Sequence, residues 1–316
     1  MQRHLTITPS PHVRDRASTK NIMQEVCLAL APAGIASVIL FGAAALKLIC
    51  FSVLTCVLTE YLYQLITGHK STVGDWSAVV TGLMLAYNLP ATAPWWIPVV
   101  GGVIAILLVK QMFGGIGSNF MNPALTARAV LFISWGGLVA SYPNTVYCGG
   151  VDTISSATPL AVMAADPSQV KFMDLLLGNV PGILGETCKI ALLLGGAYLI
   201  IRQIIDWRIP ACFIGTVFVL YLLTSGFNFE LAVKEIFAGG LMLGAFFMAT
   251  DYATCPLSRK GRILMGLGCG IFTFVIRAYA NYPEGTSFAI LFMNVLTPLI
   301  DRYTMPKCFG EVKKHA

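Results

Sequence analysis

The chain contains 316 residues, of which 56% are hydrophobic and only 11% are charged, and its formal net charge is +6. Soluble domains carry about 25% charged residues, so this composition excludes a soluble globular protein. The apolar residues gather in runs of roughly 15 to 22, the length that a helix needs to cross a hydrocarbon core about 30 Å thick. We therefore predict an all-α polytopic membrane protein.

The apolar runs predict about ten transmembrane helices. Residues 1–25 hold several basic residues and no apolar stretch, so we expect a cytoplasmic N-terminal segment there. The next run, 26–66, is too long for one helix and is expected to break near Phe41–Lys47. The remaining helices are predicted at 76–92, 97–112, 123–139, 183–201, 209–225, 236–252, 263–280 and 286–300.

The basic residues predict the orientation of these helices, because Lys and Arg gather on the cytoplasmic side of membrane proteins. With ten helices and a cytoplasmic N-terminus, most of the 21 Lys and Arg residues fall in inner connectors and ends, Lys110 and Arg128 among them. A single helix over 26–66 would place most of them outside. We therefore expect both termini to be cytoplasmic, with a tail at 302–316, and a long extracytoplasmic loop at 140–182.

A repeat indicates two related halves, 26–139 and 183–301. Gly-Leu-Met-Leu occurs at 82–85 and again at 240–243, and GSNFMNPAL (117–125) is echoed by GTSFAILFMNVLTP (285–298). Because each half has five helices, an odd number, the second half must be inverted relative to the first. Transporters built from inverted repeats bind their substrates near the membrane midplane, between the repeats.

Polar residues within the predicted helices are candidate sites, since such residues are costly in a membrane and usually face the interior of a helix bundle. The candidates for an ion pathway are Glu60, Asn119, Asn122, Glu186, Lys189, Asp251 and Asn294. Asn294 echoes Asn122 in the repeat. The alternative for the asparagines is a structural role as helix caps or joints. For Glu186 and Lys189, three residues apart on one helix face, the simplest role is to pair with each other.

The extracytoplasmic loop contains a run of small and hydroxylated residues, GGVDTISSATPLAVMAADP (149–167). Thr158 followed by Pro159 predicts the start of a helix, because Thr is a favourable N-cap and Pro is favoured at the first helical position. A helix start does not explain why small residues persist upstream. Small neighbours would leave the Thr158 hydroxyl accessible to a modifying enzyme.

The run Asp152-Thr153-Ile154-Ser155-Ser156-Ala157-Thr158 resembles the acceptor motif D-(G/A)-x-(S/T)-(G/S)-A-(S/T) of bacterial flavin transferases, from which only Thr153 departs. Those enzymes join the phosphate of FMN to the last hydroxyl of the motif. The resemblance implies that Thr158 carries FMN as a phosphoester. It also implies that Asp152, Ser155, Ser156 and Ala157 form the recognised motif.

Other segments extend the resemblance over nearly the full length, to the D subunit of the Rnf complex, an ion-pumping ferredoxin:NAD oxidoreductase. These segments are SPHVRD (10–15), GGIGSNFMNPALTAR (114–128), GETCK (185–189), GAFFMATDYATCPLSRKG (244–261) and YPEGTSFAILFMN (282–294). The B subunit of the sodium-pumping NADH:quinone reductase shares the flavin motif and the ten-helix plan, but its members carry a longer N-terminal region. The Rnf protein is therefore the closer resemblance.

The resemblance implies a component of an electron-transport complex in the bacterial cytoplasmic (inner) membrane. The chain would relay electrons between ferredoxin and NAD through FMN on the extracytoplasmic side, and couple this to Na⁺ or H⁺ translocation. A second, non-covalent flavin, riboflavin, is suggested near the cytoplasmic side. The implied partners are the other Rnf subunits, A, B, C, E and G, and a flavin transferase. We expect no complete active site and no metal site in this chain alone.

Two other functions stay open from the residues alone. The inverted five-helix halves also resemble urea-transporter-like channels and permeases, in which the outer loop would be structural and no flavin would bind. A structural membrane protein without a cofactor is the third possibility. The segment 250–262 could dock a soluble partner, although its basic residues are explained equally well by the predicted topology.

Overall fold

The computed structural model describes residues 18–145, 157–280 and 285–306, and every regular element within them is a helix. The first half contains α1 (Thr19–Phe41), α2 (Ala43–Thr67), the short η1 (Val73–Asp75), α3 (Ser77–Tyr87), α4 (Trp96–Val103) continuing into the π-helix η2 (Ile104–Gln111), and α5 (Pro123–Val139). The predicted break in the run 26–66 is confirmed. It falls at Gly42, whose φ of 67° and ψ of −149° suit only glycine.

The predicted outer loop contains three short helices: α6 (Pro159–Ala165), η4 (Pro167–Gln169) and α7 (Phe172–Leu177). The second half then contains α8 (Lys189–Ile201), α9 (Arg208–Thr224), α10 (Phe229–Phe237), α11 (Leu241–Leu243) with the π-helix η5 (Gly244–Met248), α12 (Arg259–Tyr279) and α13 (Thr286–Thr304).

The prediction of one helix over 236–252 is wrong. The chain bends by 67° between α10 and the α11–η5 segment. Gly239, with a φ of 65°, lies at the bend and ends the first helix. Likewise, the helix predicted over 183–201 begins only at Lys189, and the one predicted over 76–92 ends at Tyr87.

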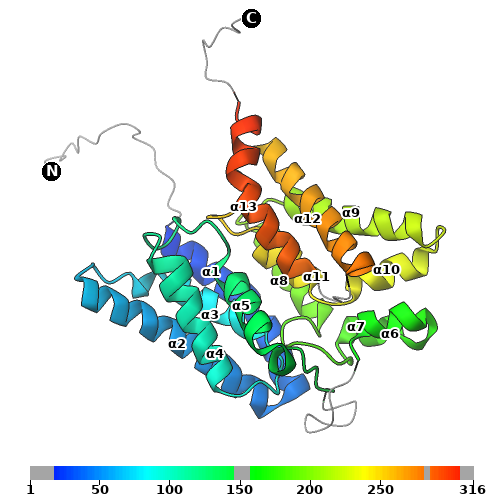
Figure 1. Ribbon diagram of the computed structural model, residues 1–316, viewed down its shortest axis with the longest axis horizontal. Coiled ribbons are helices and arrows are strands. Elements are labelled where there is room, and N and C mark those ends of the chain that lie inside the picture. The colour runs from blue at the N-terminus through cyan, green and yellow to red at the C-terminus, as the bar shows by residue number, and fades with distance from the viewer. Residues whose placement is uncertain (1–17, 146–156, 281–284, 307–316) are drawn as a thin grey trace, which may run out of the picture.

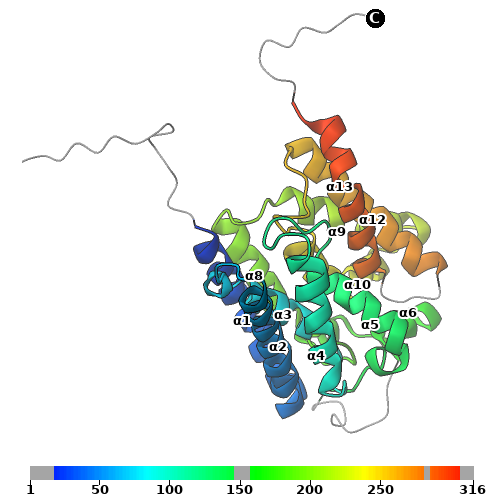
Figure 2. The same cartoon turned by 60° about the vertical axis from the view of Figure 1, so that its left-hand side comes forward.

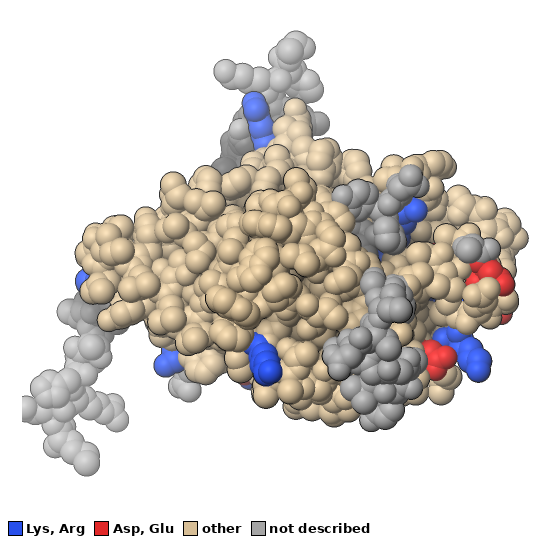
Figure 3. Space-filling model, turned by 60° about the horizontal axis from the view of Figure 1, so that its bottom comes forward, with Lys and Arg blue, Asp and Glu red and all other residues tan. Residues whose placement is uncertain are grey.

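The described helices support a polytopic membrane protein. By length and apolarity α1, α2 and α12 can each cross a membrane, and the bent pair of α10 with α11–η5 makes a fourth candidate. The other apolar helices are 10–17 residues long. In α2 the polar side chains of Ser52, Glu60 and Gln64 are buried, whereas Leu54 and Leu58 are exposed. Figure 3 shows a broad face of the molecule with few charged side chains. An apolar outside around a polar inside is expected where lipid replaces water.

The two halves lie side by side, with α1–α5 on one side of Figure 1 and α8–α13 on the other. In Figure 2 α8 lies beside α1. At their interface α1 packs against α8 and α5 contacts α13. These are the first and last helices of each predicted half. The α1–α8 contact is so close that a Cβ atom at Gly195 would collide with the carbonyl oxygen of Ala29.

Candidate functional site

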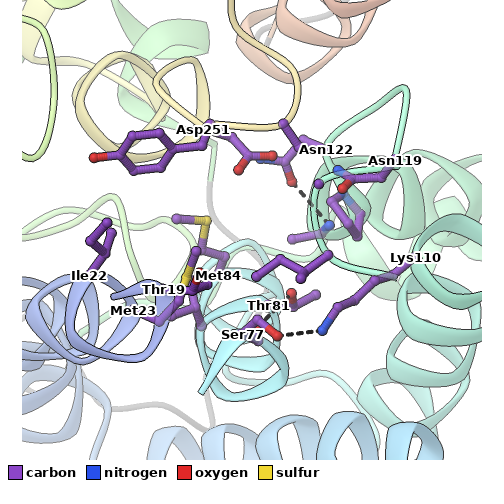
Figure 4. A pocket seen from close by; sticks show the side chains of 17 residues that line it. Thr19, Ile22, Met23, Ser77, Thr81, Met84, Lys110, Asn119, Asn122 and Asp251 are labelled. Carbon is purple, nitrogen blue, oxygen red and sulfur yellow. Dashed lines mark hydrogen bonds between the residues drawn. The ribbon is translucent and has the colours of Figure 1, made fainter. Parts of the chain in front are cut away.

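A cavity of about 350 Å³ lies where the two halves meet, and we call it the central cavity (Figure 4). Its walls come from the start of α1, from α3, from η2 and the loop after it, from the start of α5, and from residues 251–253. Apolar side chains such as Ile22, Val80 and Met84 line one part of it. Its polar lining includes Ser77, Thr81, Lys110, Asn119, Asn122 and Asp251. Three of the residues predicted for an ion pathway, Asn119, Asn122 and Asp251, are therefore neighbours.

Glu60 reaches this cavity through Lys110. The Lys110 ammonium lies 2.7 Å from Glu60 Oε2 and donates to Ser77 Oγ at 2.5 Å, and both charged side chains are buried. Glu60 Oε1 also accepts from Thr72 Oγ1 at 2.9 Å and from Gln64 Nε2 at 3.4 Å. A buried ion pair with such additional hydrogen bonds avoids the cost of an uncompensated charge.

Asn122 and Asn294, the two asparagines that the repeat relates, are in contact. With its amide oriented to satisfy both groups, Asn294 accepts from the backbone N–H of Asn122 at 3.2 Å. Asn122 is also the N-cap of α5, because its Oδ1 accepts from the N–H groups of Ala124 and Leu125. Its Nδ2 donates across the interface to the carbonyl of Met248 at 3.4 Å. Asn122 thus has the predicted capping role and also joins the halves.

A buried arginine beside this contact was not expected. The topology count treats Lys110 and Arg128 as charges of inner connectors, but both side chains lie inside the bundle. Arg128 Nη1 donates to Asn88 Oδ1 at 3.0 Å and to Ser287 Oγ at 2.6 Å. The interior satisfies these charges with hydrogen bonds, so they give no information on sidedness. The position of Arg128 in the second turn of α5, after a Pro at the first position, was the signal available in the sequence.

The Thr158 side chain is the N-cap of α6, as predicted, and Pro159 is the first helical residue. Thr158 Oγ1 accepts from the N–H of Ala161 at 3.3 Å. The expected accessibility of the hydroxyl is not found, because Thr158 is only 3% exposed. Ala157 is exposed, whereas Asp152, Ser155 and Ser156 lie outside the described residues.

A second cavity, of about 690 Å³, adjoins α6, and we call it the α6 cavity. Its lining includes Leu160 and Ala161 of α6, together with Tyr221, Glu235 and Arg277 from α9, α10 and α12. Gly239 lies against both Leu160 and the guanidinium of Arg277. The sequence gave no sign that Arg277 lies close to α6.

Arg277 and Glu235 are only partly satisfied. The guanidinium donates to the carbonyls of Glu235 at 2.9 Å and Ala238 at 3.1 Å, and Arg277 Nη1 lies 3.9 Å from Glu235 Oε2. Arg277 Nε and Glu235 Oε2 are buried without a hydrogen-bond partner. Since buried polar groups are nearly always hydrogen-bonded, these two atoms mark a place where a further polar group fits.

Glu186 and Lys189 connect the start of α8 to the bend between α10 and α11. The buried Lys189 ammonium donates to the carbonyl of Gly239 at 2.6 Å and to the backbone carbonyl of Glu186. Glu186 Oε1 accepts from the N–H of Ile183 at 3.3 Å. These contacts give the pair a structural role at the bend. No group of three or more metal-ligating side chains is found in the described part of the chain.

These features define a helical membrane protein. It has a cavity with polar side chains between its two halves, and a short helix that begins at Thr158 beside a second cavity. The model of the NQR2, RnfD, RnfE family matches residues 6–310, and the chain belongs to that family.

Curated relatives match along almost their whole length. The chain is 48% identical to the D subunit of the Na⁺-translocating ferredoxin:NAD⁺ oxidoreductase complex of Acetobacterium woodii, over 99% of this chain and 98% of that protein. It is 40% identical to the D subunit of the proton-translocating ferredoxin:NAD⁺ oxidoreductase complex of Clostridium ljungdahlii, over 96% of each chain. The D subunit of an ion-translocating oxidoreductase complex from Halorhodospira halophila is 36% identical, over 97% of this chain and 96% of that protein.

Proposed function

We propose that the chain is the membrane component of an ion-pumping ferredoxin:NAD oxidoreductase complex in the bacterial cytoplasmic membrane. The similarity at 48% identity over 99% of the chain to a protein named as the D subunit of such a complex carries the proposal. The partners are then the other subunits of that complex, A, B, C, E and G. The relatives are named as parts of redox complexes, which favours this function over a permease or a structural protein without a cofactor.

We further propose ten membrane passages in two inverted halves, with both termini cytoplasmic. The contacts between α1 and α8 and between α5 and α13 support this, because a two-fold axis between halves brings equivalent elements together. The two copies of the Gly-Leu-Met-Leu repeat are related in the same way: α3 contains the first copy, and η5 directly follows the second. Asn88 at the end of α3 donates to Met248 Sδ at the end of η5, at 3.7 Å.

Thr158 is proposed to carry FMN as a phosphoester, and the α6 cavity fits such a group. A phosphodiester carries one negative charge, and the Arg277 guanidinium with its unpartnered Nε lies beside the helix that Thr158 begins. Tyr221 and apolar side chains of α6 also line the cavity and would hold a flat aromatic ring. When bound, the flavin supplies one- and two-electron transfer, while the chain supplies tethering and orientation.

The burial of Thr158 has a consequence for maturation. A transferase cannot reach a hydroxyl that is only 3% exposed. We infer that FMN is attached while α6 is undocked, on the extracytoplasmic side, and that α6 docks afterwards. The phosphoester oxygen can still accept the Ala161 N–H bond, so modification and the N-cap are compatible.

Three substitutions distinguish the two roles of Thr158, attachment of the flavin and capping of α6. Thr158→Ser retains both hydroxyl and cap, Thr158→Asn retains only a cap, and Thr158→Ala retains neither. Each variant is produced together with the transferase, and flavin fluorescence is measured in denaturing gels alongside the mass of the peptide that contains residue 158. We expect flavin only in the wild type and Thr158→Ser. Fluorescence in Thr158→Asn, or an unmodified peptide in the wild type, would refute the assignment.

The central cavity is proposed to hold the second, non-covalent flavin. Its volume, about 350 Å³, lies within the range of small-molecule pockets, roughly 300–1,000 Å³, and it combines apolar walls with a few polar groups. Val80→Phe fills this space, whereas Val79→Phe on the same helix places the ring outside the lining. We expect acid-released flavin, measured per covalent flavin, to be lost in Val80→Phe alone. Equal release from both variants would contradict the proposal.

Asp251 is proposed to take part in ion translocation. It is the one carboxylate among the described residues that line the central cavity, and its Oδ2 lies 3.5 Å from Thr254 Oγ1. We expect Asp251→Asn to slow ion uptake by vesicles at least tenfold while covalent flavin is retained, with Asp174→Asn as the control. The same assay, run with Na⁺ and with protons, identifies the transported ion, since one relative is named as Na⁺-translocating and another as proton-translocating.

A further inference from the structure

A third cavity lies at the end of the molecule where α8 ends and where α9 and α12 begin. Its volume is about 600 Å³, and we call it the arginine cavity. Its charged lining consists of Asp206, Arg208, Arg259 and Arg262. Its apolar lining includes Ile200, Ile204, Ile205 and Ile209, with Trp207 at the edge.

The cavity lining contains three guanidinium groups and a single carboxylate. Arg208 Nη1 and Arg262 Nη1 both donate to the same oxygen, Asp206 Oδ2, at 2.8 Å each. The other oxygen, Oδ1, accepts from the backbone N–H of Arg208 at 3.0 Å. Arg259 is exposed and forms no ion pair with any residue that the structure describes. The cavity lining therefore has two positive charges in excess, and hydrogen bonds hold the side chains of Arg208 and Arg262 in place.

The exposed residues beside the cavity are of types that occur at membrane surfaces. Trp207 is 57% exposed and Ile201 is 78% exposed, so an amphipathic ring and an aliphatic side chain project outward beside the arginines. The guanidinium of Arg208 stacks over Trp207 at 5.7 Å from the ring centroid. The lining of the cavity itself combines isoleucines with arginines.

We propose that the arginine cavity binds the phosphate of an anionic phospholipid, with the arginines on the headgroup and the isoleucines against the start of the acyl chains. Basic pockets between helices at a membrane surface bind such headgroups, and guanidinium groups hold phosphate through paired hydrogen bonds. Free phosphate would bind the arginines but would make no apolar contact with the isoleucines. An acidic protein segment would not require the outward Trp207 and Ile201.

The bound lipid would affect the central cavity through Tyr252. This residue lines both cavities, and its hydroxyl donates to the carbonyl of Ile204. Asp251 precedes it in the chain and lines the central cavity. A lipid that fixes the end of α8 against the start of α12 therefore also fixes the segment that carries Asp251.

The test uses the full-length chain, purified from membranes with the proteins that accompany it and then depleted of lipid. Binding of phosphatidylglycerol, phosphatidylethanolamine and inorganic phosphate is measured by native mass spectrometry and by the shift in thermal unfolding. The variants are Arg259→Gln, Arg208→Gln with Arg259→Gln, and Arg302→Gln. Arg302 is an exposed arginine at the end of α13, outside the cavity, and serves as the matched control.

We expect phosphatidylglycerol to bind most strongly. Its affinity should fall roughly fivefold in Arg259→Gln and further in the double variant, and stay unchanged in Arg302→Gln. Unchanged affinity in the double variant would overturn the proposal. Equal binding of phosphatidylethanolamine, or displacement of the lipid by millimolar phosphate, would also overturn it. Loss of an accompanying protein from the double variant, with lipid binding intact, would show that the arginines dock protein instead.

Discussion

Removal of one partner from the buried Glu60–Lys110 pair should be strongly destabilising. Glu60 is fully buried, and the Lys110 ammonium at 2.7 Å is its one cationic partner among the described residues. In Lys110→Met the carboxylate keeps its hydrogen bonds from Thr72 at 2.9 Å and Gln64 at 3.4 Å but loses its counter-charge. Breaking a buried pair from one side costs about 3–5 kcal/mol, and the two retained bonds place the expected loss at about 3 kcal/mol.

The double variant Glu60→Gln with Lys110→Met tests whether this loss is due to charge. It removes both charges and leaves an amide that still accepts from Thr72, so most of the lost stability should return. Thermal unfolding in detergent gives the readout, at about 2 °C per kcal/mol for a large domain, so Lys110→Met should lower the midpoint by about 6 °C. If the double variant is less stable than Lys110→Met, packing of the lysine stem rather than the uncompensated charge is responsible.

Two further predictions concern helix packing and pH. Gly195→Ala on α8 should destabilise by about 1–3 kcal/mol, because its Cβ meets the carbonyl of Ala29, whereas Gly215→Ala on α9 has open space and should stabilise by up to about 1 kcal/mol; thermal unfolding of the two compares them directly. Partial burial acts to raise the pKa of Asp206, but the N–H of Arg208 and the neighbouring guanidinium groups outweigh it and hold the pKa below its usual value. The charged form of Asp206 therefore contributes stability above about pH 4, its unfolded pKa, and this is lost as the pH falls through the lower folded pKa. Asp206→Asn should remove that part of the acid sensitivity in unfolding scans between about pH 5 and pH 3.

Most of the helix positions followed from the sequence, because long apolar runs have few alternatives in a membrane. The break near Gly42 followed from the length of the apolar run, and the start of α6 at Thr158 followed from its capping residues. The bend at Gly239 did not, since the run continues to be apolar on both sides of it. The contact of the buried Lys189 with the Gly239 carbonyl at the bend is recognised only when the fold is known.

The polar candidates were identified by residue type, but their grouping depends on the contact between halves. Asn122 and Asn294 are far apart in the chain and meet through a backbone N–H that no pattern specifies. Arg128 was misplaced for a related reason: a count of positive charges assumes that each faces water, and this one is satisfied by Asn88 and Ser287 instead. Sequence periodicity gives the face of a helix, not the partner that it meets.

The two halves have the same order of helices but differ in where their ion pairs lie, and this difference bears on the central cavity. In the first half the second and fourth helices, α2 and α4–η2, are joined by the Glu60–Lys110 pair. The corresponding helices of the second half, α9 and α12, pack through Gly266 against Ile209 and Phe213. Their ion pair, between Arg262 and Asp206, lies where the two helices begin, and its side chains are 31% and 12% exposed. The Glu60–Lys110 pair is instead buried within the helices, and its lysine also lines the central cavity. This asymmetry favours a role for Glu60 and Lys110 in what that cavity binds or conducts.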